Sequence, residues 1–206
     1  MRSGWLEELL GLRCPGCGRA LDTPALCQTC RSELVPKVSG QFAYLGSYVR
    51  WKGLARSIKY RGKQDVVPVL AKLLARAVGR SGWEIQTVTA VPTLLHRKVK
   101  RGYNQAELLA RGLALELGLP YLEMLSRKRY TPSQTKKSPA ERLQLPADTF
   151  TGKRVVKGAV LLVDDVITSG ATFLRAREAL LEAGAEKVYG ACIAVRASPE
   201  TAIPGI

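Results

Sequence analysis

The stretch that most constrains this chain is Val160–Thr172, which reads VLLVDDVITSGAT. Its four leading apolar residues predict a short strand that is buried on both faces. Two carboxylates, Asp164 and Asp165, follow the strand directly, and a run of small and hydroxyl residues comes next. Phe173–Ala183 then has the apolar spacing of a helix, with Gly184 as its natural end. The segment therefore predicts a strand, an acidic pair, a small-residue loop and a helix, in that order.

This order favours a phosphate site, because a loop that leads into a helix offers free backbone N–H groups and the positive end of the helix dipole. The acidic pair suits the vicinal hydroxyls of a ribose, or a hydrated Mg²⁺ shared with them. The inferred ligand is a ribose 5-phosphate unit. The alternative is an ordinary buried strand followed by a helix cap, which accounts for neither the adjacent acids nor the hydroxyl cluster. The residues predicted to hold the phosphate are Thr168, Ser169, Gly170, Ala171 and Thr172.

A second strand–loop–helix unit precedes the first. Val88–Val91 predicts a strand, Leu94–Gly102 a cationic loop, and Tyr103–Leu117 a helix. A cationic loop beside a phosphate site is expected to hold a pyrophosphate group, although a solvated basic loop is the simpler alternative. Asn104 is expected either to bind phosphate or ribose oxygens or to cap the helix. The residues assigned to this pyrophosphate loop are Pro92, Thr93, Arg97, Arg101, Asn104 and Gln105.

Two Cys-x-x-Cys pairs, Cys14/Cys17 and Cys27/Cys30, are separated by nine residues. Two such pairs complete a tetrahedral Cys₄ site, which predicts structural Zn²⁺ because no ligand position stays open. The alternative is a redox dithiol, which needs only one pair. Cys192 lies in an apolar strand pattern, and we expect it in the core.

The charge of the chain is strongly positive, with 32 Lys and Arg against 17 Asp and Glu, a net charge of +15. Such a field favours polyanionic partners, although an inert basic surface is equally compatible with it. The first residues do not resemble a signal peptide, since Glu7 and Glu8 interrupt the apolar run. No stretch approaches the ~20 apolar residues of a membrane-spanning helix. We therefore expect a cytoplasmic protein, in which cysteines stay reduced.

The sequence predicts an α/β fold, with a parallel sheet flanked by helices, and two domains at residues 1–38 and 39–206. Residues 1–38 would hold a short helix and the cysteine module, and Val35–Gly40 would be a linker. Phe42–Trp51 has a strand pattern, and Asp65 is expected to cap a helix that runs to about Val78. Ser126–Arg142 is polar and basic and contains two prolines, so we expect a flexible loop that closes over a ligand or contacts nucleic acid.

The acidic pair and hydroxyl loop resemble the phosphoribosyl-pyrophosphate (PRPP) signature of type I phosphoribosyltransferases. In that family the acids bind the ribose hydroxyls and the loop holds the 5-phosphate. With the remaining motifs, nearly the whole chain resembles the ComF family of competence-associated, amidophosphoribosyltransferase-like proteins. Those motifs are the Cys₄ module, Ile58-Lys59-Tyr60-x-Gly62, Val91-Pro92, Arg101-Gly102-Tyr103-Asn104-Gln105, Gln134 and Ala140-Glu141-Arg142-Leu143.

The resemblance implies a type I phosphoribosyltransferase-like fold and a role in natural transformation, in which imported single-stranded DNA is handled. We expect sequence-independent DNA binding, with Tyr130, Tyr103 and Trp51 as candidate stacking residues and other competence proteins as possible partners. The alternative is an active, Mg²⁺-dependent phosphoribosyltransferase that acts on a nucleobase or amine. In that case Arg101 and Gln134 would be the candidate catalytic residues.

Overall fold

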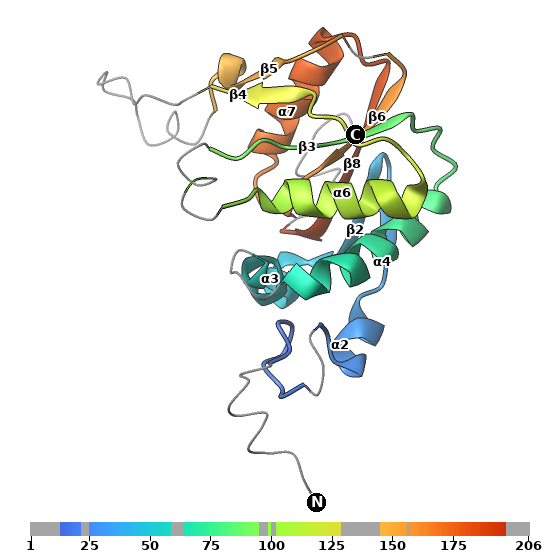
Figure 1. The fold of residues 1–206 in the computed structure, drawn as a ribbon, viewed down its shortest axis with the longest axis vertical. Coiled ribbons are helices and arrows are strands. Elements are labelled where there is room, and N and C mark those ends of the chain that lie inside the picture. The colour runs from blue at the N-terminus through green and yellow to red at the C-terminus, as the bar shows by residue number, and fades with distance from the viewer. Residues whose placement is uncertain are drawn as a thin grey trace, which may run out of the picture.

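A six-stranded sheet with helices on both faces forms the centre of the computed structural model (Figure 1). The structure describes residues 13–21, 25–58, 64–94, 99, 102–128, 145–155 and 157–196. The strands lie in the order β1-β2-β8-β6-β3, and β7 pairs with β8 beside this path. Their bounds are β1 Lys37–Ser39, β2 Phe42–Ser47, β3 Thr87–Ala90, β6 Ala159–Val163, β7 Val166–Ile167 and β8 Lys187–Val195.

The pairs β3–β6, β6–β8, β7–β8 and β2–β8 are all parallel, as the βαβ pattern predicts. Strands β6 and β8 are buried over nearly their whole length, which explains their continuous apolar sequences. Strand β1 departs from the prediction, because it pairs antiparallel with β2 inside the expected linker Val35–Gly40. The turn at Gly40, with φ of 54°, lets the chain reverse between the two strands.

Helices cover both faces of the sheet (Figure 1). The buried residues of α3, α4 and α6 share one apolar cluster, whereas those of α7 belong to a second cluster on the other face. The bounds of the helices are α2 Gln28–Glu33, α3 Tyr48–Ser57, α4 Val67–Gly79, α6 Gln105–Leu117 and α7 Ala171–Glu182.

Two helix starts differ from the prediction. The expected strand Phe42–Trp51 ends at Ser47, whose side chain accepts a hydrogen bond from the Arg50 N–H and so caps α3. Trp51 is therefore a helical core residue with 3% exposure, and it is not a surface platform for a nucleic-acid base. Asp65 lies in a short 3₁₀ turn, η1 Gln64–Val66, and α4 starts after it without a side-chain cap.

Residues 125–127 and 150–152 form a separate antiparallel hairpin, β4 Leu125–Arg127 with β5 Phe150–Gly152. A second short turn, η3 Ala147–Thr149, leads into β5. Ser126 and Arg127 are thus strand residues, which corrects the predicted start of the flexible loop at Ser126. Most of that loop, and Gln134 within it, lies outside the described residues.

The cysteine module lies against α3. Cys14, Cys27, Cys30 and Leu34 belong to the same buried cluster as Trp51 and the inward faces of α3, α4 and α6. The predicted boundary at residue 38 falls within β1, and the predicted helix in residues 1–12 lies outside the described part of the chain. None of the described helices is long and apolar enough to cross a membrane.

The pairing of β2 with β8 gives a stability prediction. Gly190 lies opposite Phe42 in the ladder, and a Cβ there would overlap the Phe42 ring and lie 2.7 Å from Phe173 Cζ. The two rings pack edge to face at 5.0 Å. Gly190→Ala should therefore destabilise the fold by about 1–3 kcal/mol, the usual cost of overpacking a core.

The matched control is Gly79→Ala at the end of α4, where a Cβ meets nothing within 4 Å. This change should leave stability unchanged or raise it by up to about 1 kcal/mol. Urea unfolding followed by circular dichroism measures both variants. Equal stability of the two would show that Phe42 and Phe173 do not pack over Gly190.

Candidate functional site

The acidic pair lies where β6 ends and the sheet opens. The N–H of Asp164 donates to the Ala191 carbonyl at 3.0 Å, and the Ile193 N–H donates to the Asp165 carbonyl at 3.1 Å. Both carboxylates also accept local hydrogen bonds, because Asp165 N–H donates to Asp164 Oδ1 at 2.8 Å and Val166 N–H to Asp165 Oδ1 at 2.9 Å. Strand β8 therefore holds the backbone of both acids in place at the carboxyl edge of the sheet, the edge at which ligands bind such folds.

The predicted phosphate loop is shorter than expected, because α7 includes its last two residues, and the short strand β7 comes directly before it. Thr168 and Ser169 are exposed, and Gly170 is buried with φ of 75°, a conformation that favours glycine. Ala171 and Thr172 form the first turn of α7. No side chain of the described residues caps this helix, so its first N–H groups face the loop without a side-chain acceptor.

Burial raises the pKa of Asp164 well above its usual range, and the neighbouring charge of Asp165 adds to this shift. The positive charge of Arg127 acts in the opposite direction. The pair is therefore held together against electrostatic repulsion. A cation or a set of hydroxyl donors placed beside it would relieve that repulsion.

The second predicted loop starts at the end of β3, the strand next to β6. The Val91 N–H donates to the Val163 carbonyl at 2.9 Å, which brings Pro92 and Thr93 to the same edge of the sheet as Asp164. Gln105 is buried in the first turn of α6. Arg97 and Arg101 lie outside the described residues, so their predicted roles stay predictions.

Asn104 caps α6 and ties it to the strand end. Its Oδ1 accepts the Ala106 N–H at 3.2 Å, and its Nδ2 donates to the Val91 carbonyl at 3.0 Å. With 7% exposure, the side chain is buried. Of the two predicted roles, the structure supports the cap. Asn104 thereby links the start of α6 to the end of β3, directly before Pro92 and Thr93.

Arg127 is a site residue that the sequence analysis missed. Its Nη1 donates to the Pro92 carbonyl at 3.4 Å, and its guanidinium lies 5.2 Å from the centre of the Phe150 ring. Because its charge also acts on Asp164, Arg127 lies between the two predicted loops. The sequence analysis placed it in the flexible loop Ser126–Arg142, and only the pairing of β4 with β5 distinguishes it from its basic neighbours.

A pocket of about 320 Å³ opens beside Arg127 at the end of β3. Pro92 and Thr93 line it, and so do residues of α6, the hairpin and the segment between them. Two of these, Glu107 and Glu123, form ion pairs with Arg111 and Lys153. The other lining residues are Ala90, Asn104, Tyr121, Leu125, Ser126, Arg127 and Lys153.

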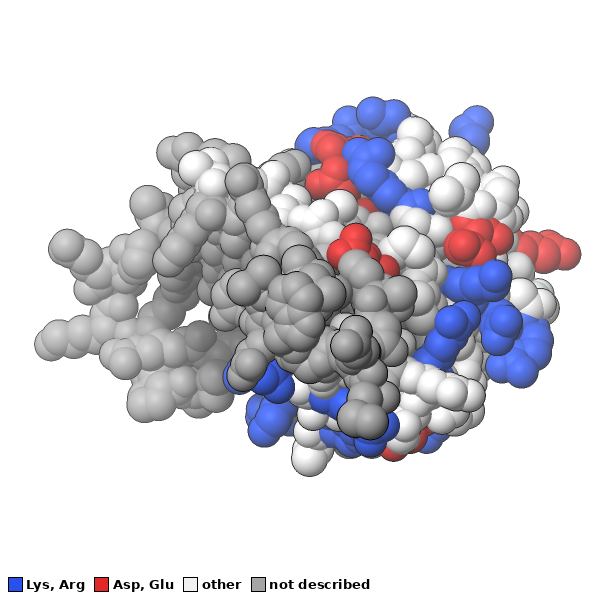
Figure 2. All heavy atoms as spheres, turned by 60° about the horizontal axis from the view of Figure 1, so that its bottom comes forward, with Lys and Arg blue, Asp and Glu red and all other residues white. Residues whose placement is uncertain are grey.

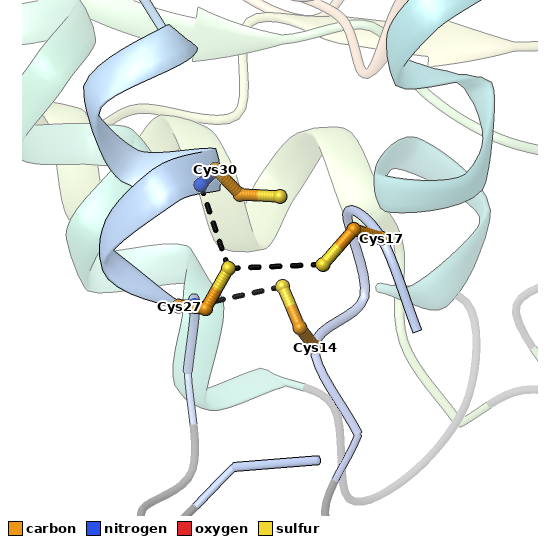
Figure 3. Close-up of side chains that lie close together, drawn as sticks. All are labelled: Cys14, Cys17, Cys27 and Cys30. Carbon is orange, nitrogen blue, oxygen red and sulfur yellow. Dashed lines mark hydrogen bonds between the residues drawn. The ribbon is translucent and has the colours of Figure 1, made fainter. Parts of the chain in front are cut away.

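The four predicted metal ligands converge (Figure 3). Their sulfur atoms all lie within 4.8 Å of one another, and Cys17 Sγ lies 3.7 Å from Cys27 Sγ. A tetrahedral zinc with Zn–S bonds of about 2.3 Å places its sulfurs about 3.8 Å apart. The donor set and spacing therefore fit a Cys₄ metal site.

Backbone hydrogen bonds prepare the cluster for thiolates. Burial raises the pKa of Cys14, but hydrogen bonds from the backbone of Cys27, Gly16 and Cys17 outweigh this effect and lower the pKa to about 6. Burial and the neighbouring thiols raise the pKa of Cys30 to about 12. The sulfurs therefore share protons unequally, and a metal ion that replaces those protons would bind all four as thiolates.

Arg50 joins this cluster to α3. Its guanidinium donates to Glu33 Oε2 at 2.6 Å, to the Gly16 carbonyl at 3.2 Å and to Cys30 Sγ at 3.8 Å, and it lies 4.1 Å from the centre of the Trp51 ring. One side chain thus contacts the first cysteine turn, the helix that carries Cys30, and the core residue on which the module packs.

Comparisons with known proteins agree with this architecture. Residues 102–203 match the family model "Phosphoribosyl transferase domain". The chain is 29% identical to "DNA utilization protein YhgH" of Salmonella typhimurium over 189 residues, covering 87% of this chain and 82% of the relative. It is 29% identical to "Competence protein ComFC" of Streptococcus pneumoniae, covering 85% and 77%, and 28% identical to that of Bacillus subtilis, covering 87% and 75%.

Among solved structures, the glutamine PRPP amidotransferase from B. subtilis, complexed with ADP and GMP, is 27% identical with a TM-score of 0.46. The match covers 67% of this chain, which spans 30% of that chain. The adenine phosphoribosyltransferase of Leishmania tarentolae is 13% identical with a TM-score of 0.42, covering 83% of this chain and 100% of that one.

The fold is that of a type I phosphoribosyltransferase, a helix-flanked and mainly parallel sheet, with a Cys₄ cluster added at its N-terminal end. The curated relatives match 85–87% of this chain. Its likeness to YhgH and ComFC proteins over most of its length supports the ComF family for this chain.

The pKa of Asp164 gives a prediction with a defined sign. Because the folded state raises this pKa, the fold loses stability as the pH rises from the unfolded value of about 4 through the folded value. Asp164→Asn keeps an oxygen acceptor for the Asp165 N–H and removes the buried charge. The variant should therefore melt about 2–4 °C higher than the parent at alkaline pH, the shift that about 1 kcal/mol produces in a chain of this size, and the difference should vanish in acid.

Thermal melts across a pH series measure this difference, with the exposed Asp65→Asn as the control for loss of one negative charge. A Tm of Asp164→Asn below that of the parent at every pH would mean that the carboxylate stabilises the fold, and the interpretation of the pair as repulsive would be wrong.

Proposed function

We propose that the chain binds the ribose 5-phosphate portion of PRPP, together with Mg²⁺, at the carboxyl end of β6. The observation that carries this proposal is the sequence of groups along one turn of chain. Two partly buried carboxylates are followed within three residues by exposed hydroxyls and then by the uncapped N-terminus of α7. Carboxylates accept from ribose hydroxyls or hold a hydrated Mg²⁺, and helix N–H groups bind phosphate.

In this arrangement Asp164 and Asp165 hold the ribose, and Thr168, Ser169, Gly170, Ala171 and Thr172 hold the 5-phosphate. The pyrophosphate group then lies toward Pro92 and Thr93. Arg127 supplies a positive charge on this side, between the two loops. Mg²⁺ would neutralise the pyrophosphate and relieve the repulsion between the two acids.

The same variant that should stabilise the fold should strongly weaken PRPP binding. Asp164→Asn removes a carboxylate that ribose or Mg²⁺ needs, so we expect PRPP affinity in the presence of Mg²⁺ to fall at least ~100-fold, about 2.7 kcal/mol. Isothermal titration calorimetry measures it, with Asp65→Asn as the control of equal charge. PRPP binding of parental strength by the stable Asp164→Asn protein would show that the ligand lies elsewhere.

We further propose that the protein acts in natural transformation and binds single-stranded DNA without sequence preference. Three observations support this: the competence and DNA-utilization names of the relatives, the net charge of +15, and the absence of a base-reading motif. PRPP would then act as a bound regulatory ligand. A location in the cytoplasm and contacts with other competence proteins remain predictions of the sequence.

The alternative is catalysis. An acceptor nitrogen would attack the anomeric carbon of PRPP and lose its proton to solvent, while the bond to the pyrophosphate oxygen breaks and pyrophosphate departs with the electron pair. The pocket beside Pro92 and Thr93 favours this alternative, because it has room for an acceptor next to the pyrophosphate side. Release of labelled pyrophosphate in the presence of nucleobases and amines tests it, and no release across a broad panel would exclude it.

We propose that Cys14, Cys17, Cys27 and Cys30 hold a structural Zn²⁺. Because Cys14, Cys27 and Cys30 share a core with α3, loss of the metal should destabilise more than the module itself. Cys30→Ser should lose its zinc and melt lower by at least about 5 °C, whereas Cys192→Ala, at a buried cysteine outside the cluster, should keep equimolar zinc. Elemental analysis and thermal melts measure both. Parental zinc content in Cys30→Ser would contradict the assignment.

A further inference from the structure

Helix α4 carries a row of basic side chains along its outer face. Most of its apolar residues are buried, while Lys72, Arg76 and the C-cap residue Arg80 are exposed at intervals of four residues. Four residues are about one helical turn, so the three charges form a straight row about 12 Å long. The sequence of α4, VPVLAKLLARAVG, contains no acidic residue.

Helix α3 adds a second, shorter row. Lys52 and Arg56 are exposed four residues apart, and this helix also lacks acidic residues. The buried sides of α3 and α4 meet in the same apolar cluster, so both helices cover the same face of the sheet (Figure 1). When that end of the molecule is turned forward, lysine and arginine side chains gather in several groups on the visible surface (Figure 2).

These five charges are not used within the described part of the chain. Other bases there form ion pairs: Arg50, Arg111, Lys128, Lys153 and Arg175 each contact an acidic side chain. No ion pair or hydrogen bond of the described residues involves the side chains of Lys52, Arg56, Lys72, Arg76 or Arg80. The charge of this surface is thus available to a partner.

The chemistry of α4 favours a nucleic-acid strand over an anionic membrane. A helix that lies on a membrane presents apolar side chains beside its charges, whereas the exposed residues within α4 are Pro68, Lys72, Arg76 and Gly79. Helix α3 exposes one large apolar side chain, Val49, which lies in its first turn before Lys52 and Arg56. The described aromatic residues of α3 and α4 offer no free ring, since Trp51 is buried and the half-buried Tyr48 has the Arg196 guanidinium 5.4 Å from its ring centre. Contact would therefore be with phosphates.

We infer that the outer faces of α3 and α4, which we call the α3–α4 face, bind the backbone of single-stranded DNA; this inference rests on the proposed DNA-binding function. The strand would follow the rows of charge without any reading of its bases. The helix that begins at the phosphate loop, α7, covers the opposite face of the sheet. DNA and PRPP would therefore occupy separate surfaces, and the protein could bind both at the same time.

Charge-removing variants of the full chain test the inference. Lys72→Gln/Arg76→Gln and Lys52→Gln/Arg56→Gln each remove two charges from the α3–α4 face, and glutamine keeps good helix propensity. The control, Arg154→Gln/Lys157→Gln, removes the same net charge between β5 and β6. Fluorescence anisotropy with a labelled oligothymidine, measured across a salt series, gives the affinity and the slope of log K against log salt.

Each α3–α4 pair should reduce the salt slope by about 1.4, since each lost phosphate contact contributes about 0.7 for a single strand, and should weaken binding about tenfold at moderate salt. The variant that combines both pairs should reduce the salt slope by about 2.8. The control should keep the parental slope, and all variants should keep parental PRPP affinity and parental melting temperature.

The outcomes separate this inference from the function on which it rests. If the parent binds no oligothymidine at low salt, the proposed DNA-binding function fails. If the parent binds and the α3–α4 variants behave like the control, DNA lies on another surface and the inference alone fails. If the variants instead lose binding to phosphatidylserine vesicles and keep oligothymidine binding, the face contacts a membrane, which also overturns the inference.

Discussion

The parallel pairing of β6 with β3 on one side and β8 on the other is the constraint on which the site depends. Parallel strands end at the same edge of a sheet, so Asp164, which follows β6, and Pro92, which follows β3, emerge close together. The register makes this definite, because Val91 N–H donates to the Val163 carbonyl and Asp164 N–H to the Ala191 carbonyl. A shift of one residue in either ladder would turn these side chains toward the opposite face.

The site is also where the fold departs from the rules that govern its core. Buried residues elsewhere on β6 and β8 are apolar, whereas Asp164 is a carboxylate whose burial raises its pKa, with a second carboxylate beside it. Helix α7, like α4, begins without a side-chain cap, whereas Asn104 caps α6 and Ser47 caps α3. The repulsion between the two acids costs folding free energy, and so do the unpaired N–H groups at the start of α7. A bound cation would remove the first cost and a bound phosphate the second. Functional sites commonly carry such costs.

The cysteine module shows a different dependence. Its ligands converge through two short turns, but three of the four cysteines are buried against the α3 side of the core. Trp51 fills this contact, and Arg50 joins the Gly16 carbonyl, Cys30 and Glu33 from the same helix. The module and α3 are therefore stabilised together. The α3–α4 face lies on the outside of this same layer of helices.

The order of groups along the chain could be predicted from sequence because it is local. A short apolar run, two acids, hydroxyls and a helical pattern define β6, the pair and α7, and four cysteines at fixed spacing define a metal cluster whatever the rest of the chain does. The two possible roles of Asn104 could also be named, but its choice of the helix cap depends on Val91, thirteen residues away. Local pattern sets periodicity and residue chemistry, and it carries little information on which distant segment lies alongside.

Tertiary structure decided the features that need a distant partner. Strand β7 exists because the two residues between the acidic pair and the expected loop pair with β8, and β1 exists because the expected linker pairs with β2. Trp51, expected at the surface, is buried because α3 starts at Tyr48 and turns it toward the cysteines. Arg127 resembles the basic residues around it until β4 pairs with β5 and directs it between the two loops. The sequence by itself determined which chemical groups the site contains, and the long-range pairing of strands decided which of them meet.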